Sequence, residues 1–220
     1  MNFKPMKNGA MAIAVAVAAV TVTVHGADAA KNMSHVHIGH VMDGWKGTPG
    51  NAGFLPTAIK EAEIANTHAQ IALKKSGDLK WLKVHTGHVL NALDPALEAQ
   101  GPGLGYGVRK AAKGTAKHIN LAASSKDASG NVKAHAVHVA MAPANINGWI
   151  DQIKELATGI KNASNASEAA PKARKIAEIT GWIENGHDAN GDGEATWVKG
   201  EGGLKQAMKH AGLMKSGEGL

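Results

Sequence analysis

Apolar residues recur every three or four positions through most of the chain, a spacing typical of helices packed against a core. A first helix is expected over residues 55–75, where small and branched apolar residues follow one face. A second is expected over residues 79–93 and ends at Asp94-Pro95, because proline cannot continue a helix. No stretch shows the alternation of apolar and polar residues that predicts a strand. The pattern therefore predicts an all-α fold.

The same spacing continues in the second half of the chain, with breaks that mark the ends of further helices. Pro143 is expected to break or kink one of them, since proline lacks the amide hydrogen that a helix interior needs. The first three of these helices are expected over residues 108–124, 131–143 and 143–160. A polar linker at 162–170 follows. Two more helices are expected over residues 171–185 and in the tail at 200–220.

Histidines repeat in register along the first four of these helices. The pattern H-x16-H-x2-H occurs twice, 50 residues apart, and the flanking segments 67–72 and 117–122 are also alike. The two copies place histidines at His68, His85 and His88, and at His118, His135 and His138. Because each copy spans two expected helices, the chain is predicted to form a pseudo-twofold four-helix bundle over residues 55–142. It would arise from a duplicated helical hairpin, with extra C-terminal helices.

The spacing within each copy suits a metal site. Residues three apart are neighbours on a helix, so His85 with His88, and His135 with His138, each offer two nitrogens to one ion. The antiparallel helix before each pair would add His68 to the first and His118 to the second. Imidazole binds zinc, copper and iron alike, so copper or zinc is expected, with iron as a further candidate.

Two other cofactor arrangements fit the same residues. Heme b could be held by one histidine from each repeat, with alanine and glycine making room for the porphyrin. Alternatively, the two triads could converge on one dinuclear centre, which is similar in composition to the coupled dicopper sites of oxygen carriers and phenol oxidases. The H-x2-H spacing departs from the usual motifs of those proteins. Without any cofactor, the six histidines would be ordinary polar residues on helix edges, or sensors of pH.

Three of the histidines outside the repeat are further candidate ligands. His37 and His40 form a third H-x2-H within a Gly/His-rich segment, residues 30–54, where a short turn or strand followed by a loop is expected. They would either add ligands to a metal site or belong to a flexible polar segment that leads into the first helix. His210 lies on the tail helix with Met208 and Met214. These three residues could be soft copper ligands, or the two methionines could instead pack in the core.

An acidic loop near the C-terminus resembles the calcium loop of EF-hand proteins. Its ligand positions are filled by Asp188, Asn190, Asp192, Glu194 and Thr196, and a helix precedes it. The resemblance implies a Ca²⁺ ion bound within residues 188–199. Lys199 stands where the motif has a bidentate glutamate, and Glu201 follows two residues later.

The first residues have the pattern typical of a secretory signal peptide. Lys4 and Lys7 precede an apolar run over residues 10–24, and Ala27-Asp28-Ala29 offers a small-x-small cleavage site. The run is shorter than the roughly 20 residues that span a membrane. The sequence therefore predicts a signal peptide over residues 1–29, a periplasmic or secreted mature protein, and no stable membrane span after cleavage.

Composition limits the possible functions. The chain has no cysteine, which excludes disulfides and c-type heme attachment. Its net charge of +6 comes from lysines scattered among acids, and an exported protein is not expected to bind nucleic acid. No nucleophile with a base and an orienting group is evident. The histidine-bearing bundle, residues 55–161, with C-terminal helices over residues 162–220, is thus predicted to bind metal. It would act in metal handling or electron transfer, with a redox or metal-delivery protein as partner, rather than as an enzyme.

Overall fold

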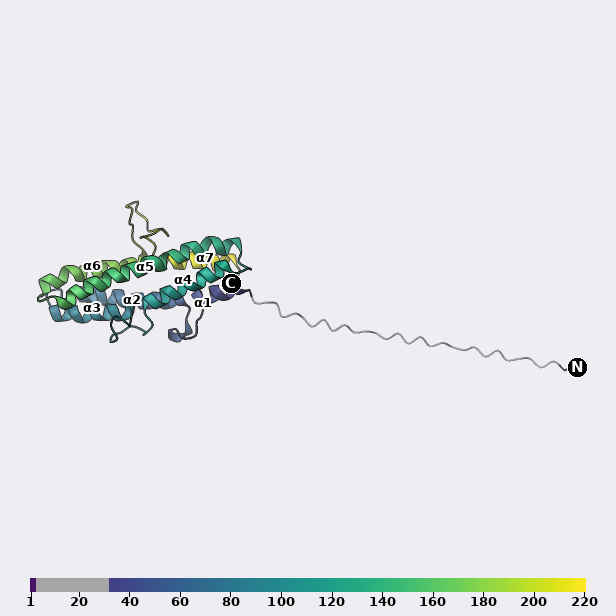
Figure 1. Ribbon diagram of the computed structural model, residues 1–220, viewed down its shortest axis with the longest axis horizontal. Helices are drawn as coiled ribbons and strands as arrows, with labels where there is room; N and C mark the ends of the chain where they lie inside the picture. The colour runs from purple at the N-terminus through teal and green to yellow at the C-terminus, as the bar shows by residue number, and fades with distance from the viewer. Residues whose placement is uncertain (3–31) are drawn as a thin grey trace. The chain divides into compact units, whose positions relative to one another are not determined.

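The computed structural model describes residues 1–2 and 32–220. Residues 32–220 form a helical bundle without a β-strand (Figure 1), which confirms the all-α class. The helices are α1 (Met33–Met42), α2 (Phe54–Leu73), α3 (Leu79–Leu93), α4 (Val108–Ser124), α5 (Gly130–Asn162), α6 (Ala166–Asn185) and α7 (Leu204–Gly217), with a short 3-10 helix, η1 (Pro49–Asn51). The predicted signal peptide lies outside the described residues, apart from Met1 and Asn2. No described helix is long and apolar enough to cross a membrane.

Helices α2 and α3 form the first predicted hairpin. Asp78 caps α3 by accepting a hydrogen bond from the backbone amide of Trp81, at 3.0 Å. The alanine face of α2 is fully buried, and it lets α3, α4 and α6 approach closely; it consists of Ala58, Ala62, Ala65, Ala69 and Ala72. Helices α4 and α5 pack against each other as the second predicted hairpin. The origin of the two hairpins by duplication stays a prediction.

Helix α5 runs without interruption for 33 residues and carries Pro143 in its interior. The two helices expected on either side of this proline are therefore one. Val139, Ile146 and Ile150 are fully buried along the helix, which packs against α3, α4, α6 and α7. This burial offsets the roughly 3 kcal/mol that a proline costs inside a helix.

Residues 33–42 form a helix rather than the short turn or strand expected there. Asn32 caps α1 by accepting from the backbone amide of His35, at 3.0 Å. Asp127, in the α4–α5 loop, accepts from the free amides of Met33 and Ser34 at 2.6 and 3.0 Å. Ile38 and Val41 are buried against the bundle. The helix is thus fixed by partners distant in sequence, which local pattern alone does not reveal.

The C-terminal part differs from expectation at the linker. Helix α6 already begins at Ala166, so most of the segment expected as a linker at residues 162–170 is helical. Ala169 and Ala170 are buried there, because α6 packs along α2 and α5. The loop between α6 and α7 protrudes from the helices (Figure 1) and returns the chain to α5 through α7.

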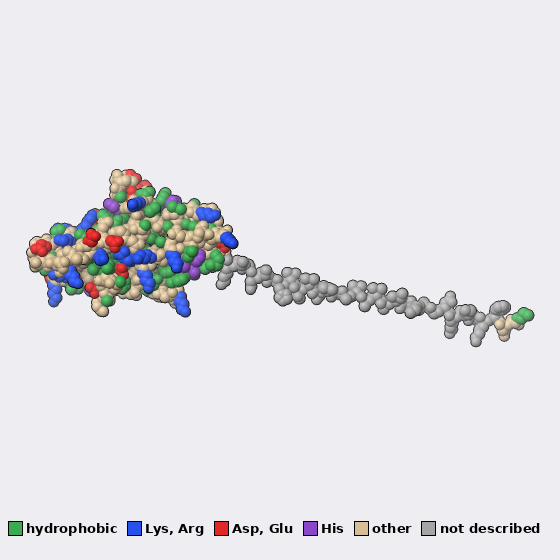
Figure 2. Space-filling model, viewed as in Figure 1, with side chains coloured by type: hydrophobic (Ala, Val, Ile, Leu, Met, Phe, Trp, Pro, Cys, Tyr) green, Lys and Arg blue, Asp and Glu red, His purple; other side chains and the backbone are tan. Residues whose placement is uncertain are grey.

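Two carboxylates tie distant parts of the bundle together. Glu61, fully buried in α2, accepts from the backbone amides of Leu104, Tyr106 and Gly107 and thereby folds the glycine-rich α3–α4 connection onto the bundle. Glu218 joins three elements, because it accepts from the three side chains of His35 in α1, Ser129 before α5 and Asn131 in α5. The surface in Figure 2 shows basic and acidic side chains interspersed, with a few histidines reaching solvent.

Candidate metal centres

The first centre is the α2–α3 triad, formed by His68, His85 and His88. The Nδ1 atom of His68 lies 3.0 Å from Nδ1 of His85 and 3.2 Å from Nδ1 of His88. These are the three histidines that the sequence groups together, and the short turn between α2 and α3 brings them to one point as expected. His85 is buried, with 8% of its surface exposed.

The second centre is the α1–α4 triad, formed by His37, His40 and His118. Nδ1 of His118 lies 3.1 Å from Nδ1 of His37 and 3.2 Å from Nδ1 of His40. The predicted grouping of His118 with the histidine pair of α5 is therefore wrong. Helix α1 packs on α4 and offers its own H-x2-H pair to His118, which is only 6% exposed.

The third centre is the α5–α7 triad, formed by His135, His138 and His210. Nδ1 of His210 lies 3.1 Å from Nδ1 of His135 and 3.3 Å from Nδ1 of His138. Helix α7 packs on α5 and turns His210 inward with Ala207, Ala211 and Met214. Met214 is fully buried and belongs to the hydrophobic core.

The three triads share one geometry that fits a metal ion. In each, the Nδ1 atom of one histidine lies 3.0–3.3 Å from two other Nδ1 atoms. A ring nitrogen carries either one proton or one lone pair, so it can make one hydrogen bond as donor or as acceptor. The central Nδ1 atom therefore cannot form good hydrogen bonds with both of its neighbours. A tetrahedral ion with bonds of about 2.0–2.1 Å sets its nitrogens about 3.3–3.4 Å apart. The described residues thus contain three groups that could hold a metal ion.

Six of the nine triad rings are poised in the neutral form that binds metal. Burial, followed by repulsion from neighbouring histidines, lowers the pKa of several rings below the usual 6.5. For His118 the pKa falls to about 4, with Lys117 as a further cause. The others with a lowered pKa are His40, His68, His85, His138 and His210. Near pH 7 these imidazoles are therefore neutral, and an incoming ion need not displace their protons.

Each triad also packs against a tryptophan ring. The indole of Trp45 lies 4.8 Å from the rings of His40 and His118, measured between ring centres. Trp81 lies 4.3 Å from His85. Trp197 lies 4.5 Å from His138 and 4.8 Å from His210. Three of the five tryptophans in the chain therefore flank a triad.

The spacing of the nitrogens favours a non-heme ion. Two axial histidines on opposite faces of a heme stand about 4 Å apart at their nitrogens, with the porphyrin between them. The triad nitrogens are closer than this, and a third ring occupies the same point. The six predicted ligands also do not form one cluster, since they are divided among three separate groups. The predicted convergence on a coupled dicopper centre is therefore wrong for these six residues.

The calcium-like loop closes on itself through hydrogen bonds. The carboxylate of Asp188 accepts from the backbone amides of Gly191, Asp192 and Gly193 at 2.7–3.1 Å. Glu201 is buried and accepts from the backbone and hydroxyl of Thr196. No three carboxylates of this loop lie within reach of one ion in the described structure. Calcium binding within residues 188–199 stays a prediction.

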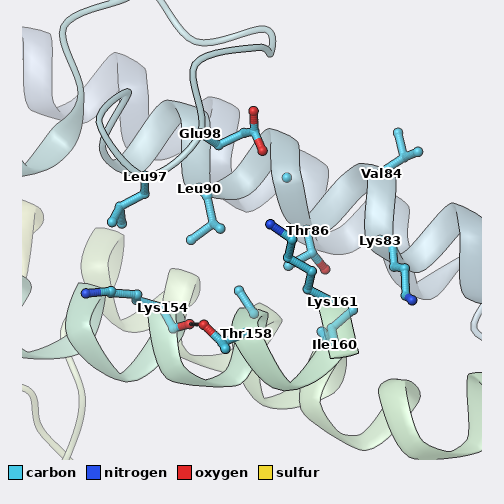
Figure 3. Close-up of a pocket in the computed structure, with 12 residues that line it drawn as sticks. Lys83, Val84, Thr86, Leu90, Leu97, Glu98, Lys154, Thr158, Ile160 and Lys161 are labelled. Carbon is cyan, nitrogen blue, oxygen red and sulfur yellow. Dashed lines mark hydrogen bonds between the residues drawn. The ribbon is translucent and has the colours of Figure 1, made fainter. Parts of the chain in front are cut away.

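A cavity of about 420 Å³ lies between α3 and α5, apart from the triads (Figure 3). Lys83, Lys154 and Lys161 surround it, and Leu90 and Ile160 contribute to its apolar wall. Its lining contains no histidine. The cavity is therefore not part of the candidate centres.

Two features of the centres were missed by sequence reasoning. The sequence predicts a helix for His210 but not its meeting with the α5 pair, although its inward position among Leu204, Ala207 and Ala211 is visible in the helical spacing. Nor does the repeat connect the three tryptophans with the histidines. Trp45 and Trp81 stand within a few residues of an H-x2-H pair, which is the signal that could have revealed them. Trp197 has no such signal.

The chain was compared with known protein families, with curated proteins and with solved structures. None of the three comparisons found a match. Any indication of function therefore comes from the triads themselves, through their donor atoms, their spacing and their burial.

Proposed function

We propose that this protein binds up to three transition-metal ions, one at each triad, and serves in metal handling. The observation that carries the proposal is the recurrence of one donor set. Three Nδ1 atoms converge at 3.0–3.3 Å on three different pairs of helices. One cluster of histidines has many ordinary explanations, but three clusters with the same geometry point to one shared ligand.

The donor set defines the class of ion. Each group consists only of histidines, without an aspartate or glutamate among the described residues. Imidazole suits copper, zinc, iron and nickel, whereas magnesium, calcium and manganese prefer oxygen donors. The proposed cargo is therefore a borderline or soft transition metal, and copper and zinc are the first candidates.

Metal handling suits the arrangement better than catalysis or electron transfer. A catalytic metal needs acid–base groups beside it, whereas no aspartate or glutamate belongs to any of the three groups among the described residues. Three similar sites on separate helix pairs raise the number of ions that one chain carries. Together with the predicted signal peptide, this supports a carrier or buffer in the periplasm or outside the cell, which passes metal to a delivery partner.

Elemental analysis of the purified full chain tests this proposal. We expect up to three ions per chain after loading with copper or zinc, and one fewer in each of the variants His68→Ala, His118→Ala and His210→Ala. His187→Ala is the matched control, because His187 stacks on Trp182 and belongs to no triad. A chain that retains no stoichiometric metal, or an equal loss in the His187 variant, would contradict the proposal.

A further inference from the structure

The tryptophans beside the triads come from unrelated places in the chain. Trp45 lies in the loop after α1, Trp81 in the first turn of α3, and Trp197 in the loop before α7. A simple repeat of one segment would have carried the tryptophan to the same position in each copy. The indole is instead supplied three times by different segments, which indicates that the histidine triad itself requires it.

Each indole is held in place by contacts of its own. The ring nitrogen of Trp81 donates to the carbonyl of Ile71 at 2.9 Å. Trp45 packs on Phe54, with 5.1 Å between ring centres, and Phe54 in turn stacks on His118. A methyl group at Gly114 would clash with the ring of Phe54, so this glycine leaves the space that the stack needs.

Trp197 is the informative case, because 41% of its surface is exposed. Its loop is fastened to α5 by Asn145, whose amide donates to the carbonyls of Val198 and Gly202 and accepts from the amide of Gly200, at 2.7–3.2 Å. Glu201 holds the same loop, because its carboxylate accepts hydrogen bonds from Thr196, the residue before Trp197. A costly exposed indole is thus kept against His138 and His210 instead of turning into the core.

The triads offer no negative charge to a bound ion. No aspartate or glutamate belongs to any of the three groups within the part of the chain that the structure describes. The buried Nε2 of His210 has no hydrogen-bond partner there, so no carboxylate adds charge through that ring. Lys117 and Lys209 add positive charge beside His118 and His210. Since the cost of burying an ion grows with the square of its charge, a divalent ion is penalised about four times as heavily as a monovalent one.

We propose that the tryptophan at each triad makes the site selective for Cu(I) over divalent ions. The face of an indole attracts a cation, but the indole nitrogen has no lone pair to serve as a fourth ligand. Zn²⁺ takes four ligands in nearly all protein sites, whereas each group supplies three imidazoles and no carboxylate. Cu(I) carries a single charge and accepts three imidazoles. The inference rests on the metal handling proposed above and identifies its cargo.

Competition titrations on the full chain test this selectivity. The α5–α7 triad is isolated in a His68→Ala/His118→Ala background, and Trp197→Leu is introduced there. Trp182→Leu is the matched control, because Trp182 stacks on His187 outside the triads. Cu(I) affinity is measured under ascorbate against a colorimetric Cu(I) chelator, and Zn²⁺ affinity against a colorimetric zinc chelator. As Trp197 lies in a protruding loop, its replacement is expected to leave the bundle folded, which circular dichroism checks.

We expect Trp197→Leu to weaken Cu(I) binding by about three- to tenfold, the range for a partly exposed cation–π contact. Zn²⁺ binding should be unchanged or tighter, because the indole cannot supply the fourth ligand that this ion needs, and Trp182→Leu should change neither. Equal losses for both ions, or tighter binding of Zn²⁺ than of Cu(I) in the parent, would overturn the selectivity while leaving metal handling intact. Binding of neither ion in the wild-type chain would overturn both proposals.

The fluorescence of the unmutated protein gives a second test that needs no variant. Cu(I) bound beside Trp45, Trp81 and Trp197 should quench most of the indole emission in proportion to occupancy, whereas Zn²⁺ should leave it nearly unchanged. Stoichiometric Cu(I) binding without quenching would place the ion away from the indoles and contradict the inference.

Discussion

The α2–α3 and α5–α7 triads hold the same three nitrogens but are assembled in different ways. In the α2–α3 triad the ligands lie 17 and 20 residues from His68, on one hairpin. In the α5–α7 triad they lie 75 and 72 residues from His210, which reaches them only when α7 docks on α5. The first site is therefore a product of local structure, whereas the second also depends on tertiary packing.

This difference has an energetic consequence. Joining residues 75 apart removes more entropy from the unfolded chain than joining residues 17 apart. The loop-closure relation puts the difference at about 1.3 kcal/mol. A metal at the α5–α7 triad therefore acts as a long-range cross-link that fastens the C-terminal helix. The α1–α4 triad does the same for α1, since its ligands lie 81 and 78 residues apart.

The largest expected effect is that of metal removal. At free metal about 100 times the dissociation constant, each site stabilises the fold by about 2.7 kcal/mol, or roughly 5–10 °C in Tm for a chain of this size. Chelation should therefore lower Tm, and hydrogen exchange should rise first in α1 and α7. A uniform rise in exchange that includes the α2–α3 hairpin to the same extent would contradict the comparison.

A matched pair of ligand variants sharpens the comparison. His68→Ala and His210→Ala should each remove one ion, with a similar loss of binding free energy. Only His210→Ala should also expose the amides of α7, because that helix loses its cross-link to α5. Hydrogen exchange of the two metal-loaded variants measures this. Equal protection of α7 in both would show that the helix docks independently of the triad.

The dependence of the sites on tertiary structure also explains which of the triads the sequence predicts. The α2–α3 triad follows from helical spacing and a short turn, so its three histidines could be grouped in advance. His118 has an equally regular spacing to His135 and His138, yet α1 takes it instead. That outcome rests on the hydrogen bonds that Asp127 accepts from the first amides of α1 and on the burial of Ile38 and Val41, which are contacts between distant segments.

The C-terminal differences have the same origin. The continuity of α5 through Pro143 depends on packing along the whole helix, which no local rule for proline contains. The place of His210 depends on α7 returning to α5 after the protruding loop. Local pattern thus predicts most of the helices, though not α1, and one of the three centres, and tertiary contacts decide the other two.

An intermediate effect is expected from pH in the metal-free protein. The pKa of His118 falls to about 4 in the folded state, so between pH 6.5 and 4 the unfolded chain binds more protons than the folded chain. Stability should therefore fall as pH drops through this window, by about 1–2 kcal/mol for this residue after allowance for solvent screening. Urea unfolding at pH 7.5 and 5 measures it. His118→Leu should flatten the dependence, and an unchanged slope in that variant would assign the effect to other residues.

The smallest expected effect is that of Glu218, which links α1 and α5 near the end of α7. Hydrogen bonds from Ser129, Asn131 and His35 lower its pKa to about 2. The stabilisation of the fold by the Glu218 carboxylate is thus present above pH 4.5 and is lost as pH falls towards 2. Glu218→Gln should cost roughly 0.5–1.5 kcal/mol at neutral pH, the range for a hydrogen bond, as measured by urea unfolding.

The same variant should affect the triads unequally. Metal affinity should fall modestly at the α1–α4 and α5–α7 triads and stay unchanged at the α2–α3 triad. Glu178→Gln is the control, since the Lys175–Glu178 ion pair lies on the surface and is expected to contribute little. A larger stability loss in the control than in Glu218→Gln would refute the proposed role of Glu218.

Histidine-selective NMR during metal titration tests the central claim most directly. The chain contains twelve histidines, and nine of them form the triads. Titration with Cu(I) or Zn²⁺, both diamagnetic, should shift the Nδ1 resonances of those nine and leave His35 and His187 unperturbed. Coordination through Nε2, or a shift of His35 and His187 together with the rest, would contradict the three-centre account.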